Sequence, residues 1–164
     1  MSEWLNKCSV GSLVFSGLLG LGVAVHYRSK VTIAEHLNSM GLPILTKGSH
    51  EWGNVFKQYQ KEKSTLRISD LESENWSNLR DWCLNKSKEY FSHKNKDLFF
   101  KISAWCTHPY TISGWIEHNK NRSLIKDPLK KPHCETNKDK HFKHEEDQIY
   151  LQFIKDCTTL ITDK

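Results

Sequence analysis

The cysteines are the residues of this chain whose type and spacing most directly suggest chemistry. Trp82-Cys83 and Trp105-Cys106 repeat one dipeptide, each late in an expected helix. Cys83 and Cys106 are therefore a candidate structural disulfide, which requires the two helices to cross obliquely. Apart from Cys8 the chain has four cysteines, which permit three pairings. A second interpretation stays open, because cysteine on a helix face also serves as a small buried hydrophobe.

A second group of reactive side chains lies in a lysine-rich segment, where His133, Cys134, His141 and His144 follow one another closely. Imidazole and thiolate groups bind zinc and other borderline metals. The spacing matches no zinc template, however, and adjacent residues such as His133 and Cys134 rarely bind one ion together. A chain with nine histidines also produces such clusters by chance. We therefore expect no metal site and no cofactor.

Nucleophilic catalysis would require a thiol–imidazole pair, for which Cys106 with His108 or Cys83 with His93 are the candidates. A cysteine nucleophile needs an exposed, electropositive setting and a base oriented by a third group. Both cysteines fall on expected buried faces instead. The acidic residues 145–147 resemble a helix start, and the glycines that follow the first 27 residues are isolated: Gly41, Gly48, Gly53 and Gly114. We expect no catalytic or cofactor-binding residue, and hence no enzyme.

Tryptophan is the other residue type that could form a ligand site. Trp52, Trp76, Trp82, Trp105 and Trp115 stand at helical spacing beside leucine, isoleucine and phenylalanine. Such positions are typical of a hydrophobic core. Trp82 is the one expected to be exposed, because Leu79 and Cys83 take the inward direction of its helix.

The composition argues for one small domain and against sequence-specific nucleic-acid binding. The chain has 164 residues and a formal net charge of +5, from 24 lysines and arginines against 19 acidic residues. Only four of the basic residues are arginine, the side chain that best forms bidentate contacts to phosphate and guanine. The lysines between 126 and 143 alternate with acids, as in a solvated segment. We therefore do not expect nucleic acid as a partner.

The first 27 residues differ from the rest, and we interpret them as an N-terminal flank and transmembrane anchor (1–27). Residues 9–25 carry no charge and as a helix would span ~25 Å, close to the ~30 Å of a hydrocarbon core. Trp4 and Tyr27 flank them where aromatic residues favour the lipid headgroups. A cleaved signal peptide fits less well, because Val23-Ala24-Val25 is a poor cleavage site. The lipid bilayer is thus an expected partner.

The remaining sequence predicts an all-α protein with about five helices. Capping signals and apolar stripes place a helical domain over 28–118, a charged linker over 119–145 and a C-terminal amphipathic helix over 146–164 that packs on the domain. Pro109 must interrupt the fourth helix, because proline lacks the amide hydrogen that a helix requires. The expected helix starts are Thr32, Ser49, Ser73, Asn95 or Asp97, Thr111 and a position near Glu145.

Several short motifs resemble a known family. They are T-I-A-E-H-L at 32–37, S-H-E-W-G-N-V-F-K-Q-Y at 49–59, and A-W-C-T-H-P at 104–109. Together with the glycine-rich anchor they resemble the small paralogous membrane-anchored proteins of haemotropic mycoplasmas. The resemblance covers roughly residues 10–116 and the terminal helix, and it fails over 119–147. It implies membrane association and display on a wall-less cell, without an established activity.

These patterns lead to two functional hypotheses. The first is a single-pass membrane protein with an extracellular, non-enzymatic helical domain for surface interaction or antigenic display. The alternative is a cytoplasm-facing, membrane-tethered adaptor that binds nucleic acid or an acidic partner, which the net charge and the flanking Arg28 and Lys30 favour. The sequence names no specific protein partner for either.

Overall fold

The computed structural model describes residues 30–71, 75–119, 122–125 and 132–160. The expected anchor at 1–27, with Cys8, lies outside these residues. Within the described residues, no helix is both long enough and apolar enough to cross a bilayer.

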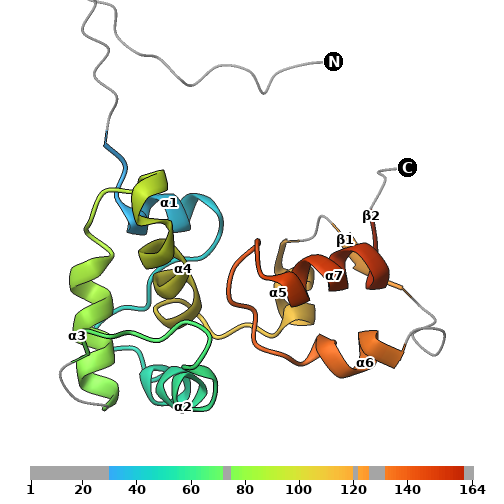
Figure 1. Cartoon of the computed structure of the whole chain (residues 1–164), viewed down its shortest axis with the longest axis horizontal. Coiled ribbons are helices and arrows are strands. Elements are labelled where there is room, and N and C mark those ends of the chain that lie inside the picture. Colours follow the sequence, from blue (N-terminus) through green and yellow to red (C-terminus); the bar gives the residue numbers. More distant parts are fainter. Residues whose placement is uncertain (1–29, 72–74, 120–121, 126–131, 161–164) are drawn as a thin grey trace, which may run out of the picture.

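The described part of the chain is mostly helical, as predicted, but it contains seven α-helices instead of about five. Figure 1 shows two lobes, one built from α1–α4 and the other from α5–α7 with two short strands. The elements in order are α1 (Ile33–Ser39), α2 (Trp52–Glu62), α3 (Trp76–Lys86), the 3₁₀ helix η1 (His93–Asn95), α4 (Lys96–Trp105), α5 (Ile112–Asn119), β1 (Arg122–Leu124), α6 (Pro132–Lys138), α7 (Gln148–Cys157) and β2 (Thr158–Leu160).

Side-chain caps explain where most helices begin. The expected capping box opens α1, where the Thr32 hydroxyl accepts from the Glu35 amide and the Glu35 carboxylate accepts from the Thr32 amide. Gly41 ends this helix with a φ of +83°, a conformation that glycine adopts without strain. The third helix starts later than expected, because Asn75 is its cap. Asp147 caps α7 by accepting from two backbone amides.

The core of the first lobe is aromatic. Trp52, Tyr59 and Trp105 are all at most 1% exposed, and the Tyr59 ring meets the Trp105 ring edge-on at 5.4 Å. The Trp105 indole donates to the Leu66 carbonyl at 2.9 Å, which satisfies its one polar atom. The apolar stripe of α2 is thus directed at α3 and α4, as its periodicity predicts.

The second lobe differs most from the sequence-based expectation. The interpretation of 119–145 as a charged linker is wrong, because this segment contains β1 and α6. Cys134 and Phe142, two of its few apolar residues, are 7% and 3% exposed and pack in the hydrophobic core. The C-terminal helix is also shorter than expected. It ends at Cys157, and Leu160 lies in β2, which pairs antiparallel with β1.

Candidate functional site

Two disulfides dominate the chemistry of the described residues. Cys83 of α3 and Cys106 at the end of α4 are bonded, with their Cα atoms 5.4 Å apart, and this is the pair that the repeated Trp-Cys dipeptide made a candidate. Cys134 of α6 and Cys157 of α7 form a second bridge that the sequence analysis did not single out. The signal that could have found it is spacing, since both bridges join cysteines 23 residues apart.

The histidine-rich segment does not converge on one metal. Among the described residues, one group comes close to a ligand set: His133, Cys134 and Cys157, whose ligating atoms lie within 4.8 Å of one another. Both sulfur atoms are in the disulfide, and a metal requires the thiolate. His133 instead pairs with Asp156 at 3.2 Å.

His141 and His144 are turned toward the first lobe. The His141 ring stacks on Trp105 with centroids 5.3 Å apart, and its Nε2 lies 2.9 Å from the Ala104 carbonyl. The His144 ring stacks on Phe100 at 3.8 Å. The role of these two histidines is therefore to join the two lobes by ring stacking.

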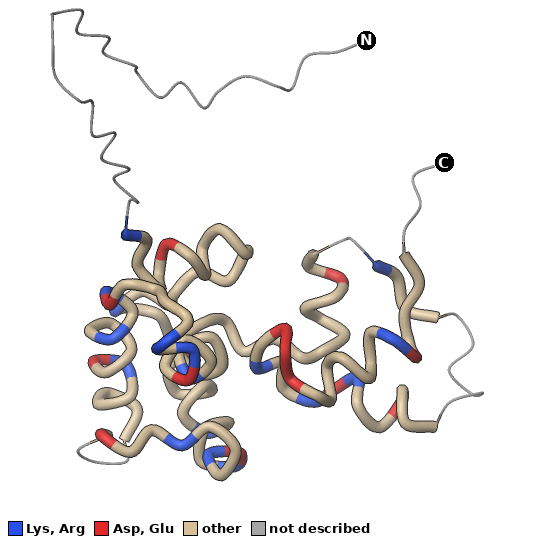
Figure 2. Tube along the Cα trace, turned by 45° about the horizontal axis from the view of Figure 1, so that its top comes forward, with Lys and Arg blue, Asp and Glu red and all other residues tan. Residues whose placement is uncertain are grey.

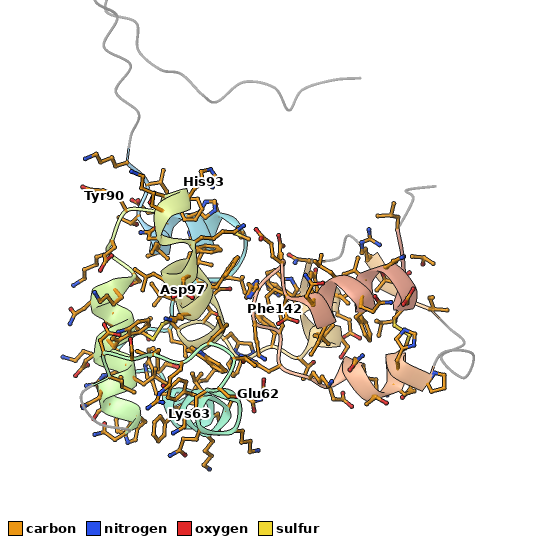
Figure 3. All side chains as sticks on the ribbon, in the orientation of Figure 1. Glu62, Lys63, Tyr90, His93, Asp97 and Phe142 are labelled. Carbon is orange, nitrogen blue, oxygen red and sulfur yellow. A yellow bond between two sulfur atoms is a disulfide. The ribbon has the colours of Figure 1, made fainter. Side chains whose placement is uncertain are left out.

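Neither thiol–imidazole pair is present. Cys83 and Cys106 have no thiol to activate while they are bonded to each other. His108 is engaged by Glu51, whose carboxylate lies 2.8 Å from its Nδ1. His93 lies in η1 before the start of α4 (labelled in Figure 3), whereas Cys106, the bonded partner of Cys83, lies at the other end of that helix.

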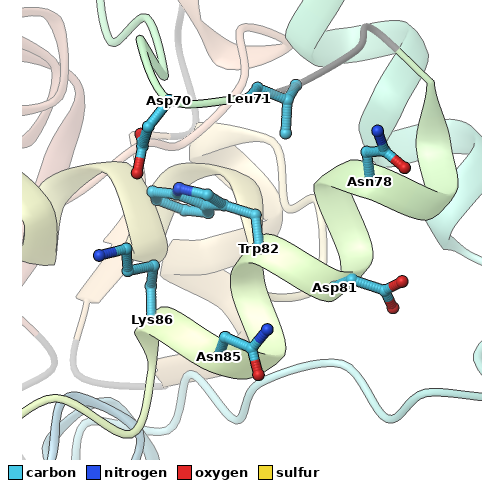
Figure 4. Close-up of a pocket in the computed structure, with 7 residues that line it drawn as sticks. All are labelled: Asp70, Leu71, Asn78, Asp81, Trp82, Asn85 and Lys86. Atoms are coloured by element: carbon cyan, nitrogen blue, oxygen red, sulfur yellow. The ribbon is translucent and has the colours of Figure 1, made fainter.

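A polar hollow of about 320 Å³ lies beside α3 and could take a small ligand (Figure 4). The Trp82 ring lies across it, and Asp70 and Leu71 approach from the segment before α3. The expectation that Trp82 is the exposed tryptophan is wrong. Trp82 is 9% exposed because this segment lies over it, whereas Trp76 is 48% exposed and packs under the Arg80 guanidinium.

Two charged groups of this hollow, Asp81 and Lys86, are held in their charged forms near neutral pH. A hydrogen bond from Arg80 lowers the pKa of Asp81, so the carboxylate stays ionised. A hydrogen bond to Glu89 raises the pKa of Lys86, so the ammonium stays protonated. Efficient proton transfer needs a pKa near the working pH. Asp81 and Lys86 are therefore better suited to binding a polar group than to transferring a proton.

The joint between the lobes includes a buried cation. Lys143 is only 7% exposed, and its Nζ lies 3.1 Å from a Glu62 carboxylate oxygen and 3.1 Å from the Thr65 hydroxyl. The Ser103 hydroxyl donates to the Lys143 carbonyl at 2.8 Å. An ion pair and a hydrogen bond thus fix residue 143 of the second lobe against the first.

Because a buried charge is costly without its partner, we expect Glu62→Gln to destabilise the protein more than Lys143→Met. The expected losses are about 2 kcal/mol for Glu62→Gln and less than about 1 kcal/mol for Lys143→Met, which removes the charge and keeps the packing. Urea denaturation followed by tryptophan fluorescence measures both. As a control, Glu89→Gln breaks the exposed Lys86–Glu89 pair and should change stability by less than about 0.5 kcal/mol. Equal losses for the two joint variants would contradict this assignment.

His141 should make the fold sensitive to mild acid. Burial lowers the pKa of His141 below the ordinary histidine value of about 6.5, and the hydrogen bond to Ala104 only partly offsets this effect. The unfolded chain therefore binds more protons once the pH falls below about 6.5, so the free energy of unfolding decreases there. The slope is at most about 1.4 kcal/mol per pH unit for one histidine.

The variant His141→Phe keeps a ring on Trp105 but cannot titrate, so it should flatten the pH dependence of stability between about pH 7 and pH 5. His144 retains part of the slope, because burial lowers its pKa too. His50→Gln, at an exposed position, is the matched control and should keep the full slope. An unchanged slope in His141→Phe would exclude this histidine as the source.

Comparison of the chain with protein-family models, with curated proteins and with solved structures finds no match.

Proposed function

We propose that this chain is a non-enzymatic, single-pass membrane protein whose helical domain faces the oxidising side of the membrane and serves surface interaction or antigenic display. One observation carries the proposal. The four cysteines other than Cys8 are all used in two disulfides, Cys83–Cys106 and Cys134–Cys157. Disulfides persist outside the cytosol and are characteristic of small extracellular domains with limited cores.

Two further features support the same proposal. The uncharged run at 9–25 has the composition of a membrane anchor and comes directly before the described domain. In the polar hollow, Asp81 and Lys86 are both held in their charged forms, which suits recognition of a polar surface better than catalysis. The family that the sequence resembles implies the same membrane association.

The alternative is a cytoplasm-facing adaptor, which the net charge of +5 favours, although Figure 2 shows Lys and Arg interspersed with Asp and Glu along the described part of the chain. Cytosolic reductants keep thiols reduced, so this orientation would remove both covalent links from the fold. The two proposals therefore differ in the side of the membrane on which the domain lies.

Protease treatment of intact cells separates the two orientations. With an epitope at the C-terminus, the outward orientation predicts that the epitope is lost from intact cells while a short N-terminal fragment stays with the membrane. A cytoplasmic protein of similar size serves as the control and should survive. If the domain is digested only after lysis, the surface proposal is wrong and the adaptor is favoured.

A further inference from the structure

The two lobes are copies of one folding unit. Both disulfides have a sequence separation of 23. One alignment of the two lobes therefore places Cys134 on Cys83 and Cys157 on Cys106. In each lobe the bridge ties a helix that carries the first cysteine to the end of a helix that carries the second. The pair α3 and α4 therefore corresponds to the pair α6 and α7.

The backbone pairing that precedes these helices repeats as well. In the first lobe the Ile33 amide donates to the Glu89 carbonyl at 2.8 Å, and in the second the Ile112 amide donates to the Lys140 carbonyl at 2.9 Å. Thr32 and Thr111, the residues before these amides, each form an isolated antiparallel bridge. Helix α1 therefore corresponds to α5. Within the described residues, α2 has no counterpart in the second lobe.

A row of three rings packs in the same way in both lobes. The first two rings stack with centroids 4.1 Å apart in the first lobe and 4.8 Å in the second, and the next two meet edge-on at 5.0 and 4.9 Å. The rows are His36, Phe91 and Phe99 in the first lobe, and Trp115, Phe142 and Tyr150 in the second. Matching covalent, backbone and ring contacts make the correspondence specific.

The joint between the lobes uses a different surface from each copy. Segment 141–144 of the second copy lies on α4 of the first, where His144 stacks on Phe100. The counterpart of this segment is 90–93, and the counterpart of Phe100 is Leu151. Tyr90 is 55% exposed and Leu151 is 45% exposed. Figure 3 places Tyr90 on the side of the first lobe away from α7 of the second, whereas His93 lines a pocket with His144 and Glu145 of the second lobe.

Among the described residues, nothing therefore covers Tyr90 in the first copy or Leu151 in the second as the joint covers their counterparts. We call residues 90–92 with Val31 the head, and the exposed side of α7 with Leu160 the tail. Five large hydrophobic residues are exposed in the described part of the chain, and four of them belong to these two surfaces: Val31, Tyr90, Leu151 and Leu160. Uncovered apolar surfaces at the ends of a repeat array favour association with another copy.

We propose that copies of this chain associate head to tail, with the head of one copy docked on the tail of the next. The internal joint is the template for this heterologous contact, in which the two partners use different surfaces. The inference rests on the fold and does not depend on the side of the membrane on which the domain lies.

Sequence differences between the two copies agree with a head that contacts a second chain, whereas segment 141–144 contacts the other lobe of its own chain. In the internal joint, Lys143 needs Glu62, which belongs to the unduplicated helix α2. The head has Ser92 at the position of Lys143, so it needs no acidic partner from a helix that the tail lacks. In the internal joint His141 stacks on Trp105. In the contact between two chains, Tyr90 takes the place of His141 and Asp156 takes the place of Trp105, so that a phenol donor lies opposite a carboxylate.

Sedimentation of the full chain in a non-ionic detergent tests the proposal. The average mass should rise above that of a 19.2 kDa chain as the protein concentration increases. Tyr90→Lys blocks the head and Leu151→Glu blocks the tail, and each should weaken association about tenfold or more. Trp76→Lys changes an exposed tryptophan outside both surfaces and should leave association unchanged.

Mixing the two blocked variants is the decisive step. Tyr90→Lys retains its tail and Leu151→Glu retains its head, so the mixture should form a one-to-one dimer and nothing larger. Equal urea midpoints for the variants and the parent chain show that the fold is intact. A parent chain that stays monomeric, association that persists in both single variants, or a mixture that stays monomeric would each overturn the proposal.

Discussion

Reduction of the two disulfides should lower the free energy of unfolding by about 6 kcal/mol. Each bridge closes a loop with a sequence separation of 23, and the loss of chain entropy in the unfolded state is then worth about 3 kcal/mol per bridge. The two loops share no residue, so the contributions should add. Small domains have total stabilities of about 5–15 kcal/mol, which means that the reduced protein should be largely unfolded or marginally stable.

Matched double variants separate the two contributions. Because the loops are of equal length, Cys83→Ala with Cys106→Ala and Cys134→Ala with Cys157→Ala should each cost about 3 kcal/mol in urea denaturation. The first pair should cost somewhat more, because both of its cysteines are fully buried, whereas Cys134 and Cys157 are 7% and 3% exposed. Reductant should then have no further effect on a chain that lacks both bridges. A loss below about 1 kcal/mol for either pair would show that the bridge does not constrain the unfolded chain.

Trp105→Ala should destabilise the protein by about 3–5 kcal/mol, the largest effect expected of a single substitution here. Trp105 is fully buried, and its ring contacts Tyr59 from the first lobe and His141 from the second. Its loss leaves a large cavity in the core and removes the donor to the Leu66 carbonyl.

Trp76→Ala is the matched control for this experiment. Trp76 is 48% exposed and makes a cation–π contact with Arg80, which at an exposed site is worth about 0.5–1 kcal/mol. The urea midpoint should therefore move little. If the two tryptophans gave similar losses, the assignment of the core in the first lobe would be wrong.

Local signals in the sequence were sufficient for α1 and α2 of the first lobe. The capping box at Thr32 and the apolar stripe of α2 involve residues three or four apart, so they can be recognised without the tertiary fold. The burial of Trp82, in contrast, depends on tertiary packing. Trp82 is covered by Asp70 and Leu71, residues that helical periodicity does not relate to it.

The second lobe could not be predicted in the same way, because its stability comes from long-range contacts. Helix α6 carries one buried residue, Cys134, and its partner in the bridge is Cys157. The strand β1 exists because it pairs with β2, with Arg122 opposite Leu160, across an even longer separation in sequence. A segment with so few apolar residues resembles a linker when it is considered alone. The equal spacing of the cysteine pairs is the clue that relates it to the first lobe.

Thiol trapping tests the central claim most directly. Cells that produce the full chain are quenched in acid and alkylated without reductant, and the cysteine-containing peptides are then identified by mass spectrometry. An outward-facing, two-bridge domain predicts that Cys83 is linked to Cys106, that Cys134 is linked to Cys157, and that none of the four is alkylated before reduction. Four alkylated cysteines would contradict the claim and place the domain in a reducing compartment.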